Sequence, residues 1–195
     1  MTRNRLEAFS DGVIAIIITI MVLELKVPHG TELGALRPLA PVFLGYVLSF
    51  LYLGIYWNNH HHLLHAAQEV TGRVLWANLL LLFCLSLFPF ATHWAGETGF
   101  SAVPVAAYGG VLLLAALSYT LLVRALLACH GPDSVLARAI GSDFKGNVSI
   151  ACYVLGTLLA WLASPWLGLA LYTVVALIWL IPDLRIERAL ADRRD

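Results

Sequence analysis

The sequence predicts an all-α integral membrane protein with six transmembrane helices, and three observations support this fold class. Of the 195 residues, 60% are hydrophobic and 12% are charged, whereas soluble domains are about half apolar and about a quarter charged. The charges are separated by uncharged runs long enough to cross a bilayer. Most Lys and Arg residues fall on one side of the predicted membrane. The high apolar and low charged fractions exclude a disordered chain and a soluble enzyme domain. A nucleic-acid-binding protein is excluded as well, because 12 basic residues balance 12 acidic ones and leave no net positive charge.

Uncharged runs define five of the six spans, since crossing about 30 Å of hydrocarbon takes roughly 20 helical residues. Residues 38–57, 74–96 and 98–123 contain 20, 23 and 26 residues without a charge, and each provides one span. Residues 146–182 contain 37 uncharged residues, too many for one crossing. Ser164-Pro165 divides this run into two spans, because proline lacks an N–H and restricts the residue before it.

The first segment has only 12 uncharged residues, from Gly12 to Leu23, between Asp11 and Glu24. Twelve helical residues reach about 18 Å. A crossing here therefore brings one or both carboxylates into the membrane, where such groups face the protein interior or water. A signal peptide and a buried re-entrant helix are the alternatives. We expect a sixth span, because the carboxylates and the missing small-residue cleavage site disfavour a signal peptide.

The distribution of basic residues predicts the orientation. With the N-terminus inside, the only basic residues outside are Lys26 and Arg37. The inner ones are Arg3, Arg5, Arg73, Arg124, Arg138, Lys145, Arg185, Arg188, Arg193 and Arg194. This positive-inside bias predicts an even number of spans with both termini in the cytoplasm. Because the loops are short, residues 1–195 are expected to form a single six-helix transmembrane domain.

One face of the first span is a stripe of branched apolar side chains. At about 100° per residue, Ile16, Ile20 and Leu23 fall within about 60° of each other, with Thr19 beside them. Asp11 lies about 140° from Ile16 by the same count. Such stripes in membrane helices usually pack against a neighbouring helix. In that interpretation Asp11 only caps the first turn of the helix.

Polar residues cluster at the inner end of the second span and within the third. Residues 57–62 read Trp-Asn-Asn-His-His-His, and His65 follows them. His61 and His65 share a helical face, so a metal site is one interpretation, although the chain has no HExxH motif. Histidines that bond to the backbone or sense pH are the more common alternative. Asn78 lies inside the third span and needs a partner, because hydrocarbon offers none.

Residues 5–12, Arg-Leu-Glu-Ala-Phe-Ser-Asp-Gly, resemble the RxxxFSD signature of the transmembrane protein 175 potassium channels. The similarity extends through the Ile-rich first span to Trp57 with its histidines, to Asn78 and to Pro89-Phe90. It covers the first half of the chain specifically and the second half only as hydropathy. The resemblance implies a prokaryotic member with six spans per subunit, assembled as a homotetramer in the cell membrane. It also implies potassium as the permeant ion and no cofactor.

The resemblance assigns the pore to the first helix. It implies that Ile16 forms the narrowest ring and that Ile20 and Leu23 form the next apolar layers. Thr19 would place a hydroxyl toward the ion path. The chain has no TVGYG-type filter sequence, since residues 45–47 read Gly-Tyr-Val without the threonine.

The resemblance also implies a structural polar network that holds the first helix to its neighbours. Its members are Arg5, Phe9, Ser10, Asp11, Trp57, Asn78 and a histidine, His60 or His61. The three consecutive histidines leave open which of these two belongs to the network.

Two other functions stay open. A secondary ion transporter or proton-coupled exchanger needs broken helices and an ionisable relay near the midplane. The later spans offer His93 as the titratable candidate other than Tyr and Cys, and it lies close to the outer end. An intramembrane metalloenzyme needs the histidines, a carboxylate and an open coordination position. We expect a potassium-selective cation channel with an apolar constriction rather than an enzyme.

Overall fold

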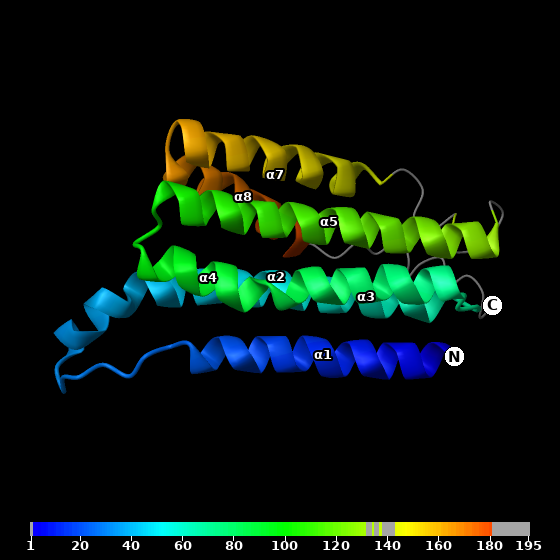
Figure 1. Cartoon of the computed structure of the whole chain (residues 1–195), viewed down its shortest axis with the longest axis horizontal. Helices are drawn as coiled ribbons and strands as arrows, with labels where there is room; N and C mark the ends of the chain where they lie inside the picture. Colours follow the sequence, from blue (N-terminus) through cyan, green and yellow to red (C-terminus); the bar gives the residue numbers. More distant parts are fainter. Residues whose placement is uncertain (1, 132–133, 135–136, 138–142, 181–195) are drawn as a thin grey trace.

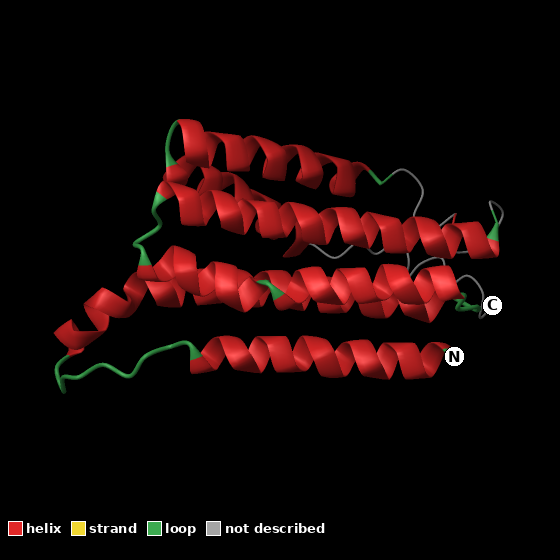
Figure 2. Cartoon of the chain, in the orientation of Figure 1, coloured by secondary structure: helices red, strands yellow, loops and turns green. Residues whose placement is uncertain are grey.

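The structure, a computed structural model, describes residues 2–131, 134, 137 and 143–180, and the regular elements in these ranges are helices. They are α1 (Arg3–Leu23), η1 (Leu33–Leu39), α2 (Ala40–Ala66), α3 (Gly72–Ser86), α4 (Phe88–Glu97), α5 (Ala102–His130), α7 (Phe144–Leu162) and α8 (Pro165–Leu180). Figure 2 shows this helical architecture. Five crossings, with α3 and α4 together forming one, are long and apolar enough to span a membrane. The shorter apolar helix α8 provides the sixth, so the predicted fold class is confirmed.

Helix α1 is longer than the uncharged run suggested. Its 21 residues reach about 31 Å, enough to cross the hydrocarbon alone. It begins at Arg3 because the residues before Gly12 include good helix formers such as Leu6, Glu7 and Ala8. Asp11 therefore lies inside the helix, and the interpretation that it caps the first turn is wrong. Glu24 is the C-cap residue.

Helix α2 continues nine residues past the predicted end at Trp57 and stops at Ala66. The histidines lie in this last part of the helix, so they extend the span instead of following it. At its other end, the 3₁₀ helix η1 leads directly into α2. Residues 45–47, which lack the threonine of a TVGYG-type filter, lie well inside α2, where Gly45 packs against Thr92 of α4.

The third span is broken into α3 and α4 at Leu87. Pro89 causes this break, because its ring nitrogen cannot donate to the carbonyl of Leu85 one turn earlier. Just before the break, the Leu87 N–H donates to the Cys84 carbonyl, three residues earlier, at 3.2 Å. This bond tightens the last turn of α3. The sequence predicted one continuous run over residues 74–96. The structure retains one crossing, which is interrupted at Leu87.

Helices α7 and α8 form a hairpin at Ser164-Pro165, as predicted. Helix α7 ends at Leu162, and Pro165 is the first residue of α8, where its missing N–H costs nothing. Tyr172 of α8 is fully buried, where it packs against Gly109 of α5 and Gly156 of α7. A side chain at Gly109 or Gly156 would collide with the Tyr172 ring, so both glycines allow this close packing.

The helices lie in layers, with α1 at one edge (Figure 1). Helix α1 packs against α2, α3 and α4. Helix α5 packs on α3 and α4 and carries α7 and α8 on its far side. One face of α1 therefore contacts the bundle while its opposite face is left open.

The described basic residues separate between the two ends of the bundle. Arg3, Arg5, Arg73, Arg124 and Lys145 occupy helix ends on the side of the N-terminus (Figure 1). Lys26 and Arg37 lie in the connection at the opposite end. The other basic residues of the predicted inner side, Arg138, Arg185, Arg188, Arg193 and Arg194, lie outside the described residues.

Candidate functional site

The predicted pore residues all lie on the open face of α1. The exposed fractions of Ile16, Ile20 and Leu23 are 59%, 41% and 81%, which is high for branched apolar side chains. Thr19 is exposed beside them. The opposite face carries Ile14, which is 1% exposed, with Ile17 and Met21 next to it. Helix α1 therefore has two apolar faces, of which the rest of the chain covers one.

Thr19 presents its oxygen rather than its proton to the open face. Its hydroxyl donates to the carbonyl of Ile16 at 2.9 Å, within the same helix. A hydroxyl oxygen has two lone pairs that remain free when its proton is used in this way. The side chain is therefore suited to interact with a cation.

A fully buried polar chain joins α1 to α2 and α3. Ser10 donates to the Leu6 carbonyl at 2.9 Å. The Asn78 amide nitrogen donates to the Ser10 hydroxyl oxygen at 2.9 Å, and the His60 Nε2 lies 2.7 Å from the Asn78 amide oxygen. Ser10, Asn78 and His60 are each 0% exposed. Predicted network members from three helices thus meet in one place.

The direction of each bond in this chain follows from the donors available. The proton of Ser10 goes to a carbonyl, so its oxygen must accept from the Asn78 amide nitrogen. The Asn78 oxygen can only accept, so His60 must carry its proton on Nε2. The Nδ1 atom of His60 is buried and has no hydrogen-bond partner within the described part of the chain. Among the described residues, the bond to Asn78 is therefore the one hydrogen bond that orients this imidazole.

A second group of contacts lies closer to the surface. The Trp57 indole nitrogen donates to the Asp11 carboxylate at 3.0 Å. The His61 Nδ1 lies 2.8 Å from the Glu7 carboxylate. The His61 ring stacks between Trp57 and His65, with centroid distances of 6.3 and 6.0 Å. Both histidines that the sequence left open thus contribute, His60 through Asn78 and His61 through Glu7.

Arg3 makes a further attachment that the sequence did not reveal. Its guanidinium donates to the carbonyls of His65 and Ala67 at 3.1 and 3.2 Å, at the end of α2. It therefore ties the start of α1 to carbonyls that have no partner inside α2. Glu7 was missed for a similar reason, because its partner lies on another helix and no spacing within the sequence indicates it.

Two predicted network members are not joined to it. Arg5 is exposed, and its side chain forms no hydrogen bond or ion pair with any described residue. Phe9 is 49% exposed. It lies seven residues before Ile16, which places the two within about 20° of each other. Phe9 therefore belongs to the open face of α1.

The open face of α1 continues into a groove against α3 and α4. The groove has a volume of about 860 Å³, and Ile16, Ile20, Pro89 and Phe90 are among its lining residues. It ends near Glu24. Pro89, which breaks the third span, thus also shapes the surface beside the predicted pore residues.

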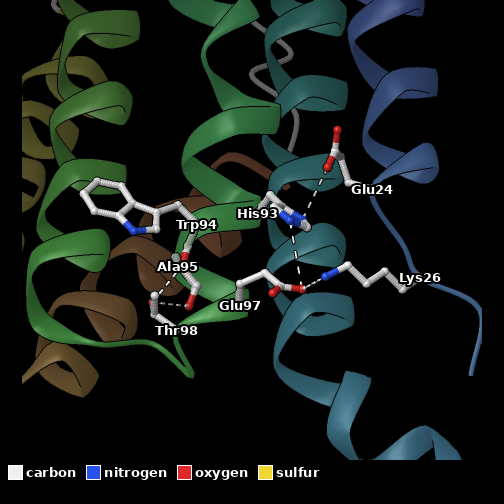
Figure 3. A network of polar contacts seen from close by, with 7 residues as sticks. All are labelled: Glu24, Lys26, His93, Trp94, Ala95, Glu97 and Thr98. Atoms are coloured by element: carbon white, nitrogen blue, oxygen red, sulfur yellow. Dashed lines mark hydrogen bonds and ion pairs between the residues drawn. The ribbon is translucent and has the colours of Figure 1, made fainter.

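Charged side chains close the end of this groove that lies away from the N-terminus (Figure 3). The His93 Nδ1 lies 3.5 Å from the Glu24 carboxylate and its Nε2 lies 4.0 Å from that of Glu97. Lys26 pairs with Glu97 at 2.9 Å. These contacts link the end of α1 to α4. They are at least partly exposed, and exposed ion pairs contribute only about 0–1 kcal/mol each.

The histidines do not assemble a metal site in the described residues. No group of three His, Cys, Asp or Glu side chains within these ranges is placed to hold a metal ion. His61 instead faces Glu7 and two aromatic rings. The intramembrane metalloenzyme therefore has no supporting geometry in this part of the chain.

Comparison with known proteins identifies the relatives of this chain. The family model described as endosomal/lysosomal potassium channel TMEM175 matches residues 5–89. A potassium channel of Chryseobacterium sp. (strain P1-3) is 54% identical over 192 residues, which cover 98% of this chain and 100% of that protein. A potassium channel of Streptomyces collinus is 37% identical over 124 residues, 60% of each chain.

The fold is also that of a solved member. The crystal structure of a lysosomal potassium-selective channel TMEM175 homolog from Chamaesiphon minutus matches with a TM-score of 0.80 and 27% identity. The match covers 93% of this chain and 97% of that one. Together, the near full-length relative, the matched signature region and the shared fold show that this chain belongs to the TMEM175 family.

Proposed function

We propose that this protein is the subunit of a potassium-selective cation channel, a homotetramer in which four copies of α1 surround a central pore. The observation that carries the proposal is the open face of α1, where Ile16, Ile20 and Leu23 are exposed although the opposite face is fully packed. The family membership and the names of the relatives support the choice of potassium.

Rotational symmetry explains how one exposed stripe makes a pore. A single α1 cannot enclose an ion path, but a cyclic assembly repeats each side chain as a ring around the axis. In such an assembly Ile16 forms the narrowest ring, and Ile20 and Leu23 form the next two apolar layers. Thr19 adds a ring of hydroxyl oxygens whose protons are held by the Ile16 carbonyls.

An apolar ring controls conduction by wetting. Branched side chains that narrow a pore enough to expel water block ions without any charge, and a small outward movement readmits water. Selectivity then depends on how much hydration an ion must lose, with help from the Thr19 oxygens, and it is modest. A TVGYG-type carbonyl filter plays no part in this proposal. The carbonyls of residues 45–47 belong to the interior of α2, where they accept helical hydrogen bonds.

The polar network has a positioning role in this proposal. Asp11 contacts Trp57 rather than the open face, and Ser10 contacts Asn78 in the buried layer. These bonds fix the rotation of α1 about its own axis. That rotation decides whether Ile16 or a neighbouring side chain faces the ions.

The arrangement of charges supports a location in the cell membrane with both termini in the cytoplasm. The described basic residues at the N-terminal end of the bundle outnumber the two at the other end, as the positive-inside rule requires. The groove end with Glu24, His93 and Glu97 then faces outward.

Two measurements on the purified full chain test the proposal. Native mass spectrometry from nanodiscs should give the mass of four copies. Liposomes that contain the protein should lose potassium down its gradient without any proton gradient. A monomeric species that still conducts would overturn the tetramer, and flux that requires an opposing proton gradient would instead identify a coupled exchanger.

A further inference from the structure

A groove between α3 and α5, outside the proposed pore, combines a basic end with apolar walls. Its volume is about 1080 Å³, above the range of roughly 300–1,000 Å³ for small-molecule pockets. Among the described residues, its lining includes Arg73 and Arg124 and no acidic side chain. Both arginines are exposed. Neither guanidinium forms a hydrogen bond or ion pair with a described residue, so the groove presents positive charge that no described side chain neutralises.

The depth of each arginine follows from the contact at the mouth of the groove. The Thr71 hydroxyl lies 3.3 Å from the Cys129 sulfur, which aligns the start of α3 with the end of α5. At 1.5 Å per residue, Arg73 lies about 3 Å inward from Thr71, and Arg124 about 7.5 Å inward from Cys129. The two charges therefore lie one above the other along the groove.

The groove becomes apolar with depth. Trp76 is 76% exposed and lies about 7.5 Å from the mouth, level with the deeper arginine. Leu80 and Leu121 line the groove about 12–14 Å from the mouth. An indole at this level is typical of the membrane–water interface. From the mouth inward, the groove thus offers positive charge, then an indole, then an aliphatic wall. A phospholipid has the complementary order, with a charged headgroup, an interfacial region and acyl chains.

The deeper arginine requires a counter-charge from outside the described protein. Helix α5 has 29 residues and is about 44 Å long, which exceeds the hydrocarbon thickness of about 30 Å by roughly 7 Å at each end if centred. Arg124 lies about 9 Å from the end of α5, so it reaches the hydrocarbon boundary. An arginine at that depth is costly unless it is paired or reaches the headgroups.

We propose that this groove binds one anionic glycerophospholipid per subunit. The phosphate lies between Arg73 and Arg124, which donate to its oxygens, and one acyl chain follows the apolar wall past Leu80 and Leu121. Charge complementarity selects a lipid with a net negative headgroup over a zwitterionic one. The site lies away from the open face of α1, so this inference goes beyond ion conduction and does not depend on it.

Native mass spectrometry of the full chain, purified with phosphatidylglycerol and phosphatidylcholine of matched acyl chains, tests the site. We expect each subunit to retain one phosphatidylglycerol in preference to phosphatidylcholine. Arg73→Gln and Arg124→Gln should each weaken retention about fivefold, the contribution of one basic residue near an anionic membrane surface. Ala128→Trp keeps both charges but fills the exposed mouth of the groove, and it should also weaken retention.

Arg37→Gln is the matched control, because it removes one exposed positive charge at the opposite end of the bundle. It should leave retention unchanged. Equal retention of the two lipids by the unmodified protein would overturn the proposal without any variant. So would retention that Arg124→Gln and Ala128→Trp leave unchanged, or a loss as large in Arg37→Gln, which would indicate bulk attraction.

Discussion

Replacing Asn78 with alanine removes the side chain that links α1, α2 and α3. The Asn78 amide donates to Ser10 at 2.9 Å and accepts from His60 at 2.7 Å. All three side chains are fully buried, so no water replaces the lost partner. The His60 Nδ1 already has no partner among the described residues. The alanine variant therefore leaves both nitrogens of this imidazole without a hydrogen bond.

The expected cost follows from the two hydrogen bonds that are lost. Interhelical hydrogen bonds in membrane proteins contribute about 0.6 kcal/mol on average and up to about 1.7 kcal/mol. We therefore expect Asn78→Ala to lower the free energy of unfolding by about 1–3 kcal/mol. Unfolding of the purified protein by sodium dodecyl sulfate, followed by circular dichroism, measures this change.

Asn59→Ala is the matched control, because among the described residues the Asn59 side chain donates only to the Ile55 carbonyl of its own helix. It should cost clearly less. The Ser10→Ala and Asn78→Ala changes should be coupled, since they share a bond, and the double variant should cost less than the sum. Additive costs, or equal losses in Asn78→Ala and Asn59→Ala, would refute the reasoning about the network.

Three further changes test other parts of the structure by the same unfolding measurement. Trp57→Phe removes the indole donor to Asp11 and should cost about 1 kcal/mol; no loss would show that this bond contributes nothing. Gly109→Ala forces a methyl group into Tyr172 and should cost about 1–3 kcal/mol, whereas Gly110→Ala, with no atom within 4 Å, should be neutral. Lys26→Met breaks an exposed ion pair and should change stability by less than about 1 kcal/mol; a larger loss would contradict the weak role assigned to this cluster.

Much of the fold could be predicted because the membrane imposes a simple length rule. Uncharged runs located the later spans, and Pro165 located the hairpin between α7 and α8. The rule failed where charged residues lie within a helix. Glu7 and Asp11 interrupt the uncharged run but not α1, because Trp57 and other partners on neighbouring helices accommodate them.

The break in the third span shows a different limit. Pro89 was visible in the sequence, but an uncharged run does not distinguish a kinked crossing from a straight one. The interruption at Leu87 depends on which carbonyl loses its donor. The break could have been predicted only if the position of Pro89 within a helix had been known beforehand.

The open face of α1 was predictable because it depends only on helical periodicity. The partners of the opposite face were not. His60 and His61 are adjacent in sequence and differ by about 100° around α2, so one reaches Asn78 and the other reaches Glu7. Which histidine meets which partner depends on how α2 is rotated against α1 and α3. That rotation cannot be predicted from the local sequence of α2.

The most direct test of the proposed pore is the current through planar bilayers under a potassium–sodium gradient, compared between Ile16→Asn and Ile18→Asn. Ile16 lies on the open face of α1, whereas Ile18 is partly buried against the core. Ile16→Asn should keep the constriction wet, raise the current and move the reversal potential toward zero as discrimination weakens. Ile18→Asn should leave the current and reversal potential of folded channels unchanged. If Ile16→Asn changes neither quantity while Ile18→Asn changes both, the open face of α1 does not line the pore.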